Sequence, residues 1–137
     1  MIDLQQANGD TAPEIYQSGL EALKVEQYDE AEKKFNKVLS RFPDDKLAGN
    51  AQYWLGETYY ARGQYEKSAV AFAKGYQQYH SSTKAPDSLL KLGMSMEALK
   101  KTKEACAAFV SLPKEFPKAE KNVKDRAVVE AKKLGCK

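Results

Sequence analysis

The feature that most constrains this chain is an internal repeat of 37 residues. Gly19, Gly56 and Gly93 follow one another at this interval, and so do Phe35, Phe72 and Phe109. Four further columns keep the interval without a gap: Ala31, Ser68 and Ala105; Phe42, Tyr79 and Phe116; Pro43, His80 and Pro117; Tyr28, Tyr65 and Thr102. Self-similarity at a period of this length indicates stacked copies of one supersecondary unit, each covering the apolar face of its neighbour.

Each copy is predicted to contain two helices. With a final helix, the pattern gives seven, over residues 13–25, 28–41, 47–62, 65–79, 85–99, 101–112 and 120–134. Pro13 and Pro86 fall in a first helical turn, where proline is tolerated. Pro113 is expected to end or kink the sixth helix earlier than its counterparts. Small residues allow the two helices of a pair to cross closely, and the second-helix aromatic fills the space beside the crossing.

The last pair needs a cover, and residues 121–134 are predicted to supply it. Ala127, Val129 and Leu134 are expected to form its apolar stripe, with Glu130 on the polar side. Gly135 is a natural stop for this helix. The fold class is therefore all-α: a superhelix of three helix-turn-helix repeats, over residues 12–45, 46–82 and 83–119, and a capping helix over 120–135. Residues 1–11 are expected to be a flexible tail before the 12–137 domain.

The middle copy carries a recognisable order of residues. Tyr53-Trp54-Leu55-Gly56, then Tyr59, Ser68 and Phe72, resembles the tetratricopeptide repeat, with the Trp displaced toward the Leu. The usual period of that repeat is about 34 residues. The extra residues here are best placed after the Pro column, in residues 44–47 and 81–84. The resemblance implies a module that binds other proteins and catalyses no reaction.

Two stretches resemble a narrower family. Residues 50–60 (NAQYWLGETYY) and 84–93 (KAPDSLLKLG) are similar to the YbgF/CpoB family of periplasmic proteins associated with the Tol–Pal system. The resemblance covers about residues 14–135. It implies a periplasmic scaffold that binds a TolA-like envelope protein, and also a peptidoglycan synthase, to coordinate envelope constriction with peptidoglycan synthesis during division. The alternative is a cytosolic adaptor that binds a helical or extended peptide of another protein.

Composition agrees with a folded domain and narrows the function. Hydrophobic residues make up 42% of the chain, and no apolar run approaches the roughly 20 residues that span a membrane. Met1–Asp10 lacks signal-peptide regions, so the chain is either cytosolic or an excised part of a longer exported protein. The formal net charge is +3, with basic and acidic residues interspersed, so nucleic-acid binding is not expected. Neither a cofactor nor a metal site is expected, because the two Cys and single His make no usual zinc set.

The two cysteines form a candidate disulfide. Cys106 lies on the sixth predicted helix, and a chain reversal at Gly135 brings Cys136 back toward it. In an exported protein, a pair of cysteines suggests one bridge. The alternative is a buried free Cys106 and a frayed Cys136. His80, in the Pro column, is interpreted as a loop residue, since no second His is available for a catalytic relay.

The concave face is the candidate binding site, because in this architecture the first helix of each pair lines it. The register places residues of all three first helices there, and their aromatic, amide and acidic side chains suit recognition of a peptide or helix. An alternative is that individual members pack between helices; Trp54 is either a wedge between repeats or a partly exposed anchor. The face lacks the Lys/Asn/Arg set that grips a C-terminal carboxylate. An uncovered face beside the first helix, if apolar, would allow weak self-association. The candidate groove residues are Tyr16, Leu20, Leu23, Asn50, Tyr53, Glu57, Tyr60, Asp87, Leu90, Met94 and Glu97.

Overall fold

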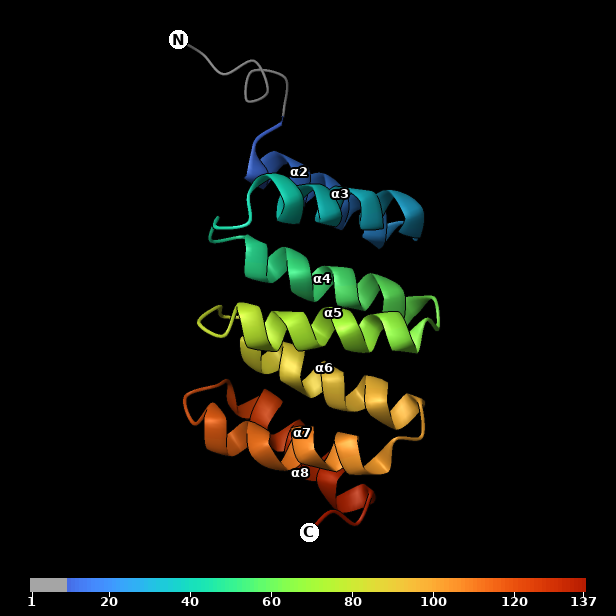
Figure 1. The fold of residues 1–137 in the computed structure, drawn as a ribbon, viewed down its shortest axis with the longest axis vertical. Coiled ribbons are helices and arrows are strands. Elements are labelled where there is room, and N and C mark those ends of the chain that lie inside the picture. Colours follow the sequence, from blue (N-terminus) through green and yellow to red (C-terminus); the bar gives the residue numbers. More distant parts are fainter. Residues whose placement is uncertain (1–9) are drawn as a thin grey trace.

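The computed structural model describes residues 10–137 as a stack of helices (Figure 1). In this part of the chain there are seven helices and no strand. They are α2 (Ala12–Lys24), α3 (Tyr28–Arg41), α4 (Ala48–Ala61), α5 (Tyr65–Gln78), α6 (Ala85–Ala98), α7 (Thr102–Glu115) and α8 (Lys121–Lys133). Residues 1–9, which hold most of the predicted tail, lie outside the described residues.

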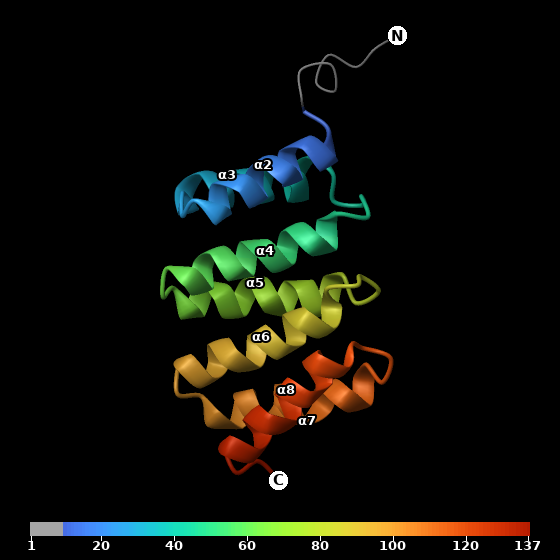
Figure 2. The ribbon, with the colours of Figure 1, turned by 180° about the vertical axis from the view of Figure 1, so that it is seen from behind.

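The helices form two layers that curve the stack. Consecutive helices pack together throughout, and α2, α4, α6 and α8 also touch one another in sequence order. Within residues 10–137, α3, α5 and α7 make no such contacts with one another. Figure 2 shows the side on which α2, α4, α6 and α8 lie in front. Because these helices converge and the other layer spreads, their side is the inner, concave face.

The glycine and phenylalanine columns meet inside each pair. Phe35, Phe72 and Phe109 are fully buried. A Cβ atom on Gly56 would lie 2.5 Å from the Phe72 ring, and one on Gly93 would lie 2.5 Å from the Phe109 ring. The first pair repeats this approach, with 2.8 Å between a Cβ on Gly19 and Phe35. The glycine column therefore reflects a steric requirement. The phenylalanine ring of the second helix occupies the space that a larger side chain at the glycine position would fill.

The turn inside each pair also has a fixed backbone. Glu26, Gly63 and Lys100 stand one period apart and have φ angles of 61°, 74° and 62°. These are left-handed values that glycine adopts without strain and other residues avoid. The middle copy therefore has the suitable residue, whereas the other two turns hold a side chain there.

Most predicted helices are confirmed to within a few residues, but the expectation for Pro113 is wrong. α7 continues through Pro113 to Glu115 and has 14 residues, like α3 and α5. Pro113 lies in the last turn, where the lost N–H removes a single helical hydrogen bond. Leu112 is fully buried on one side of it, and the Phe116 N–H still donates to the Leu112 carbonyl at 2.9 Å. Packing on both sides of the proline keeps the last turn helical.

The predicted stripe of the capping helix is also partly wrong. Val123, Ala127 and Glu130 are the buried residues of α8, whereas Val129 is 47% exposed. Glu130 Oε1 lies 3.6 Å from Arg126 Nε and 3.7 Å from Lys133 Nζ, so two cations of the same helix accompany the buried carboxylate. Positions 123, 127, 130 and 134 follow a helical period that residue 129 does not share. Gly135, with φ of 69°, follows the helix as predicted.

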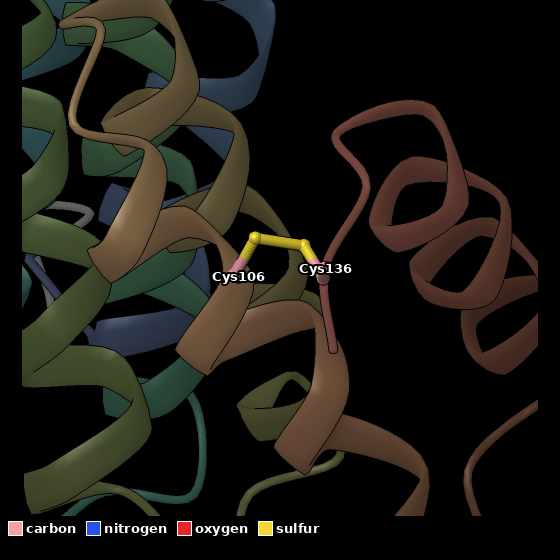
Figure 3. The surroundings of a disulfide bond; sticks show 2 residues. All are labelled: Cys106 and Cys136. Carbon is pink, nitrogen blue, oxygen red and sulfur yellow. A yellow bond between two sulfur atoms is a disulfide. The ribbon is translucent and has the colours of Figure 1, made fainter.

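A disulfide joins the cap to the last repeat. Cys106 of α7 is bonded to Cys136, which follows α8, with 5.5 Å between their Cα atoms (Figure 3). The bond spans 30 residues of sequence, so it closes a loop that contains the whole of α8. The cap is thus held to α7 at its far end as well as by packing.

Residues 10 and 11 contact the first repeat. The Thr11 side chain accepts a hydrogen bond from the Glu14 N–H at the start of α2, and Asp10 Oδ1 lies 3.5 Å from Lys37 Nζ. On α2, the columns of the buried residues Ala51, Leu55 and Thr58 hold Glu14, Ser18 and Glu21, so this side of α2 is more polar than its counterpart on α4. Weak self-association beside the first helix stays a prediction.

Candidate functional site

A cluster of aromatic rings and lysines joins α4 to α6 on the inner face. The Tyr53 and Trp54 rings meet edge to face, with centroids 5.1 Å apart. Lys84, which precedes α6, places its Nζ 4.9 Å from the Tyr53 centroid and 5.7 Å from that of Trp54. An ammonium group at such distances is attracted by the ring faces. This contact connects the second repeat to the third.

A second lysine repeats the arrangement two turns along α6. Lys91 Nζ lies 5.1 Å from the Tyr60 ring centroid and 3.1 Å from Glu57 Oε1. Both partners of the ion pair are only about one-fifth exposed, at 22% for Lys91 and 21% for Glu57. The Tyr60 ring also meets that of Tyr65 edge to face at 5.1 Å. The inner face therefore presents lysines already held in place by rings and a carboxylate.

The electrostatics of this face favour neutral tyrosines. Burial, with smaller contributions from Glu57 and Asp87, raises the pKa of Tyr53 far above its ordinary value. Burial also raises the pKa of Tyr60, where the neighbouring Tyr65, Glu57 and Glu97 act in the same direction and Arg126 of α8 opposes them. Neutral phenol groups keep their hydrogen-bonding capacity at any physiological pH.

On the same face, burial disfavours the charged form of the Asp87 carboxyl. Its pKa is raised, mainly by burial, although Lys84 and Lys91 lower it. A partner cation placed beside this carboxylate would therefore relieve the cost of its burial.

The predicted groove residues separate into two groups. Tyr53 and Leu90 are buried, at 8% and 9% exposure, so the structure assigns them to the packing between helices and not to an open surface. Tyr53 packs against Phe72, with ring centroids 5.7 Å apart. The remaining members are half-buried, which leaves part of each side chain for a partner: Tyr16, Leu20, Leu23, Asn50, Glu57, Tyr60, Asp87, Met94 and Glu97.

Sequence reasoning missed the two lysines. Lys84 and Lys91 are seven residues apart, and Lys91 lies one turn after Asp87, so helical spacing could have placed them on this face. The signal was hidden because their columns hold Leu47 and Trp54 one period earlier. The repeat register finds shared positions and not charges that occur in one copy.

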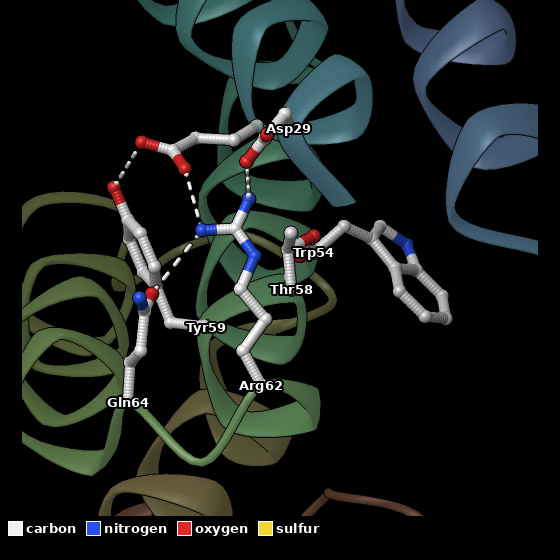
Figure 4. Close-up of polar contacts among 7 residues, drawn as sticks. Asp29, Trp54, Thr58, Tyr59, Arg62 and Gln64 are labelled. Atoms are coloured by element: carbon white, nitrogen blue, oxygen red, sulfur yellow. Dashed lines mark hydrogen bonds and ion pairs between the residues drawn. The ribbon is translucent and has the colours of Figure 1, made fainter. Parts of the chain in front are cut away.

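Trp54 has features of both predicted roles. It is half-buried and packs against the first core cluster, which contains Ile15 and Ala22 of α2, as a wedge would. Its ring also contacts Lys84 on the inner face, as a partly exposed anchor would. Figure 4 shows the ring pointing away from Arg62, which lies at the end of α4.

Arg62 clamps the first two repeats together. Its guanidinium donates to Glu32 Oε1 at 2.9 Å, to Asp29 Oδ1 at 3.1 Å and to Gln64 Oε1 at 3.2 Å (Figure 4). The Tyr59 hydroxyl donates to the other Glu32 oxygen at 3.0 Å. Because each of these groups has a partner within the protein, the cluster is explained by its role in holding the two repeats together.

His80 belongs to a small cluster at the loop end of the stack. Its ring lies 4.8 Å from that of Phe116, and its Nε2 is 3.9 Å from Glu115 Oε1, which accepts a hydrogen bond from the Tyr76 hydroxyl. Burial and this contact raise the pKa of Tyr76 to about 12. The cluster borders a hollow of about 490 Å³ between two loops. Residues 10–137 contain no group of three or more potential metal ligands, and none of their helices has the length and apolar character needed to cross a membrane.

Comparisons with known proteins agree with this architecture. A tetratricopeptide repeat family model matches residues 16–87, and a second tetratricopeptide repeat model matches residues 87–119. The chain belongs to the tetratricopeptide repeat family. The three predicted copies therefore correspond to repeats of a protein–protein interaction module.

Among curated proteins, the cell division coordinator CpoB of Pseudomonas putida is 42% identical over 57 residues. The match covers 40% of this chain and 21% of that protein, so the chain spans about one-fifth of its relative's length. This similarity supports the resemblance to the CpoB family within the repeat region. It leaves most of that protein without a counterpart here.

Solved structures share the fold. The first tetratricopeptide domain of Spaghetti (RPAP3), solved with the HSP90 peptide SRMEEVD, has a TM-score of 0.73 at 18% identity, covering 93% of this chain and 92% of that one. The Arabidopsis OM64 tetratricopeptide domain has a TM-score of 0.71 at 18% identity, covering 93% and 96%. MamA has a TM-score of 0.66 at 16% identity, covering 96% and 80%. At these identities the likeness concerns the fold alone.

Proposed function

We propose that this protein is a non-catalytic periplasmic scaffold of the Tol–Pal type, whose inner face binds a segment of a TolA-like envelope protein. In this role it helps coordinate envelope constriction with peptidoglycan synthesis during division, and a peptidoglycan synthase is the second expected partner. The observation that carries the proposal is the inner-face cluster around Tyr60, Lys91 and Glu57. The similarity to a cell division coordinator supports its biological setting.

The chemistry of the inner face suits a peptide or helix. Tyr60 and Met94 offer apolar area, and Asn50 and Asp87 offer hydrogen-bonding tips; all four are half-buried. Lys91 is already oriented by the Glu57 carboxylate and the Tyr60 ring, so binding orders few additional side chains. A similar fold with a peptide bound supports peptide recognition by such a domain.

The Cys106–Cys136 bond supports the periplasmic setting over the cytosolic alternative. Disulfides persist in oxidising compartments such as the periplasm and are rare in the reducing cytosol. The bridge lies where it holds the capping helix closed. In a reducing cytosol this bridge would not be expected to persist.

Binding of purified TolA domains, measured by calorimetry, tests the proposal. Tyr60→Ala and Lys91→Met each remove a half-buried inner-face group, and each is expected to weaken binding about tenfold. Tyr53→Ala is unsuitable, because Tyr53 is buried and its loss would open a cavity. Lys114→Met, on an exposed lysine of α7, is the matched control and should bind like the parent.

Two results would count against the proposal in different ways. If both inner-face variants bind TolA as tightly as the parent, the site is misplaced. If no TolA domain binds the folded parent, the partner is misidentified. Circular dichroism of each variant establishes that the comparison concerns folded proteins.

A further inference from the structure

The opposite face of the molecule has a groove of its own, between α3 and α5. Two adjoining hollows, of about 430 and 660 Å³, share Asn36, Gln52, Leu55 and Lys74, so they form one continuous outer groove. It lies where the outer helices spread apart and α4 is left as the floor between them. None of the inner-face cluster residues Glu57, Tyr60 and Lys91 lines it.

Three helical stripes build the outer groove. α3 contributes residues 33, 36, 37, 39 and 40; α4 contributes 52, 55 and 59; α5 contributes 66, 67, 70, 71, 74 and 78. Spacings of three and four residues keep each stripe on one face of its helix. The floor is fixed, because Gln52 Nε2 donates to the Ala71 carbonyl at 3.0 Å and Leu55 is buried in the first core cluster.

The lining combines positive charge with an apolar strip. The four lysines Lys33, Lys37, Lys67 and Lys74 line the groove, and Glu66 is the one acidic residue among its lining residues. Lys37 is already paired, because its Nζ lies 3.5 Å from Asp10 Oδ1. Lys67 Nζ lies 5.8 Å from the Tyr59 ring centroid. Val70 lies on the α5 wall and is 56% exposed, one of four large hydrophobic residues with such exposure in the described part of the chain.

The repeat itself does not require these lysines. One period later, the columns of Lys33, Lys67 and Lys74 hold Val70, Glu104 and Ser111, and only the column of Lys37 keeps a lysine, Lys74. The equivalent position between α5 and α7 is therefore much less basic, although the helices pack in the same way. The packing of the helices explains why a groove lies between α3 and α5. It does not explain why the lysines are concentrated there and not between α5 and α7.

We propose that the outer groove docks an acidic segment of a second protein, with carboxylates flanking a small aliphatic residue that contacts Val70 and Tyr59. Opposite charge steers such a segment to Lys33, Lys67 and Lys74, and the apolar strip provides desolvated contact area at its centre. The protein would then hold one partner on its inner face and another on its outer face. Scaffolding follows from these two faces without any conformational change.

A designed peptide of about 14 residues, the length of α3, tests the outer groove. It carries Glu and Leu at helical spacing, and a second peptide replaces each Glu with Lys. Fluorescence anisotropy at low salt should detect the acidic peptide and not the basic one, with affinity falling as salt increases. Amide chemical shifts should move in α3 and α5, and the double variant Lys67→Gln/Lys74→Gln should bind about tenfold more weakly.

The control variant Lys103→Gln/Lys132→Gln changes the same net charge at exposed lysines elsewhere and should bind like the parent. Equal loss in both double variants would show a nonspecific charge effect and overturn the proposal. So would shifts confined to α2, α4 and α6, or no binding up to about 1 mM peptide. Tighter binding of a single-stranded oligonucleotide, or of vesicles containing anionic lipid, at the same lysines would replace the protein segment as the occupant.

Discussion

At the scale of single residues, the repeat columns are physical requirements that are met unequally in the three copies. The glycine that lies against a phenylalanine ring is present in all three, because a Cβ there would lie within 2.8 Å of the ring. The left-handed turn position is glycine in the middle copy only, with Glu26 and Lys100 at the others. A close contact excludes alternatives, whereas backbone strain is tolerated at a limited energetic cost.

This difference gives a prediction at the turn column. Lys100→Gly is expected to raise the free energy of unfolding by about 1 kcal/mol, because the left-handed conformation costs a non-glycine residue about that much. Gly63→Ala should lower it by a similar amount, since nothing lies within 4 Å of the added Cβ and only the backbone conformation is strained. Urea unfolding of the three proteins measures both changes. A loss of stability in Lys100→Gly would mean that the lysine side chain contributes more than the strain removes.

At the scale of elements, the repeat period predicts well where the helices lie along the chain. It predicts poorly which charged and polar side chains are buried or face the binding surface. The repeat columns of Tyr28, Ala31 and Phe35 predict α3 over its full extent, and Ala31 and Phe35 are buried in the structure. The sequence predicts too short an α7, because the packing of Leu112 beside Pro113 is a tertiary effect. It also predicts the wrong stripe on α8, where Arg126 and Lys133 of the same helix lie close to the buried Glu130 carboxylate. The repeat register predicts which helices line the inner face. It does not predict Lys84 and Lys91, because these charges occur in one copy only.

The Arg62 clamp between α3 and the α4–α5 turn gives the element-scale prediction. The Arg62 side chain is 15% exposed and that of Glu32 is 29% exposed, so their ion pair is partly shielded from solvent. A double-mutant cycle with Arg62→Met and Glu32→Gln should give a coupling energy of about 1 kcal/mol that shrinks with added salt.

The exposed pair Lys121 and Asp125, within α8, serves as the control for this cycle. Its own cycle should give a coupling close to zero, because water and ions screen an exposed pair. If the two cycles give equal values, the clamp between repeats is no stronger than an ordinary surface pair.

At the scale of the whole molecule, the stack contains two core clusters, with a buried pair of serines and the buried Phe72 ring between them. One cluster unites the first pair with α4 and α5, and the other unites α6, α7 and α8. Between them, the buried hydroxyl oxygens of Ser68 and Ser95 lie 2.8 Å apart. In a stack where each pair contacts only its neighbours, a local loss of stability spreads through such interfaces and weakens with distance.

Reducing the Cys106–Cys136 bond should therefore loosen one end of the molecule and spare the other. A loop of 30 residues gives about 3–4 kcal/mol of stabilisation in the chain-entropy model, all of it acting on the capping helix and α7. Amide hydrogen exchange should accelerate strongly in α8 and α7, less in α6, and not measurably in α2 and α3. The double variant Cys106→Ala/Cys136→Ala should match the reduced parent. Uniform acceleration along the chain would instead mean that all repeats unfold as one cooperative unit, and that the contact between α5 and α6 transmits the loss of stability in full.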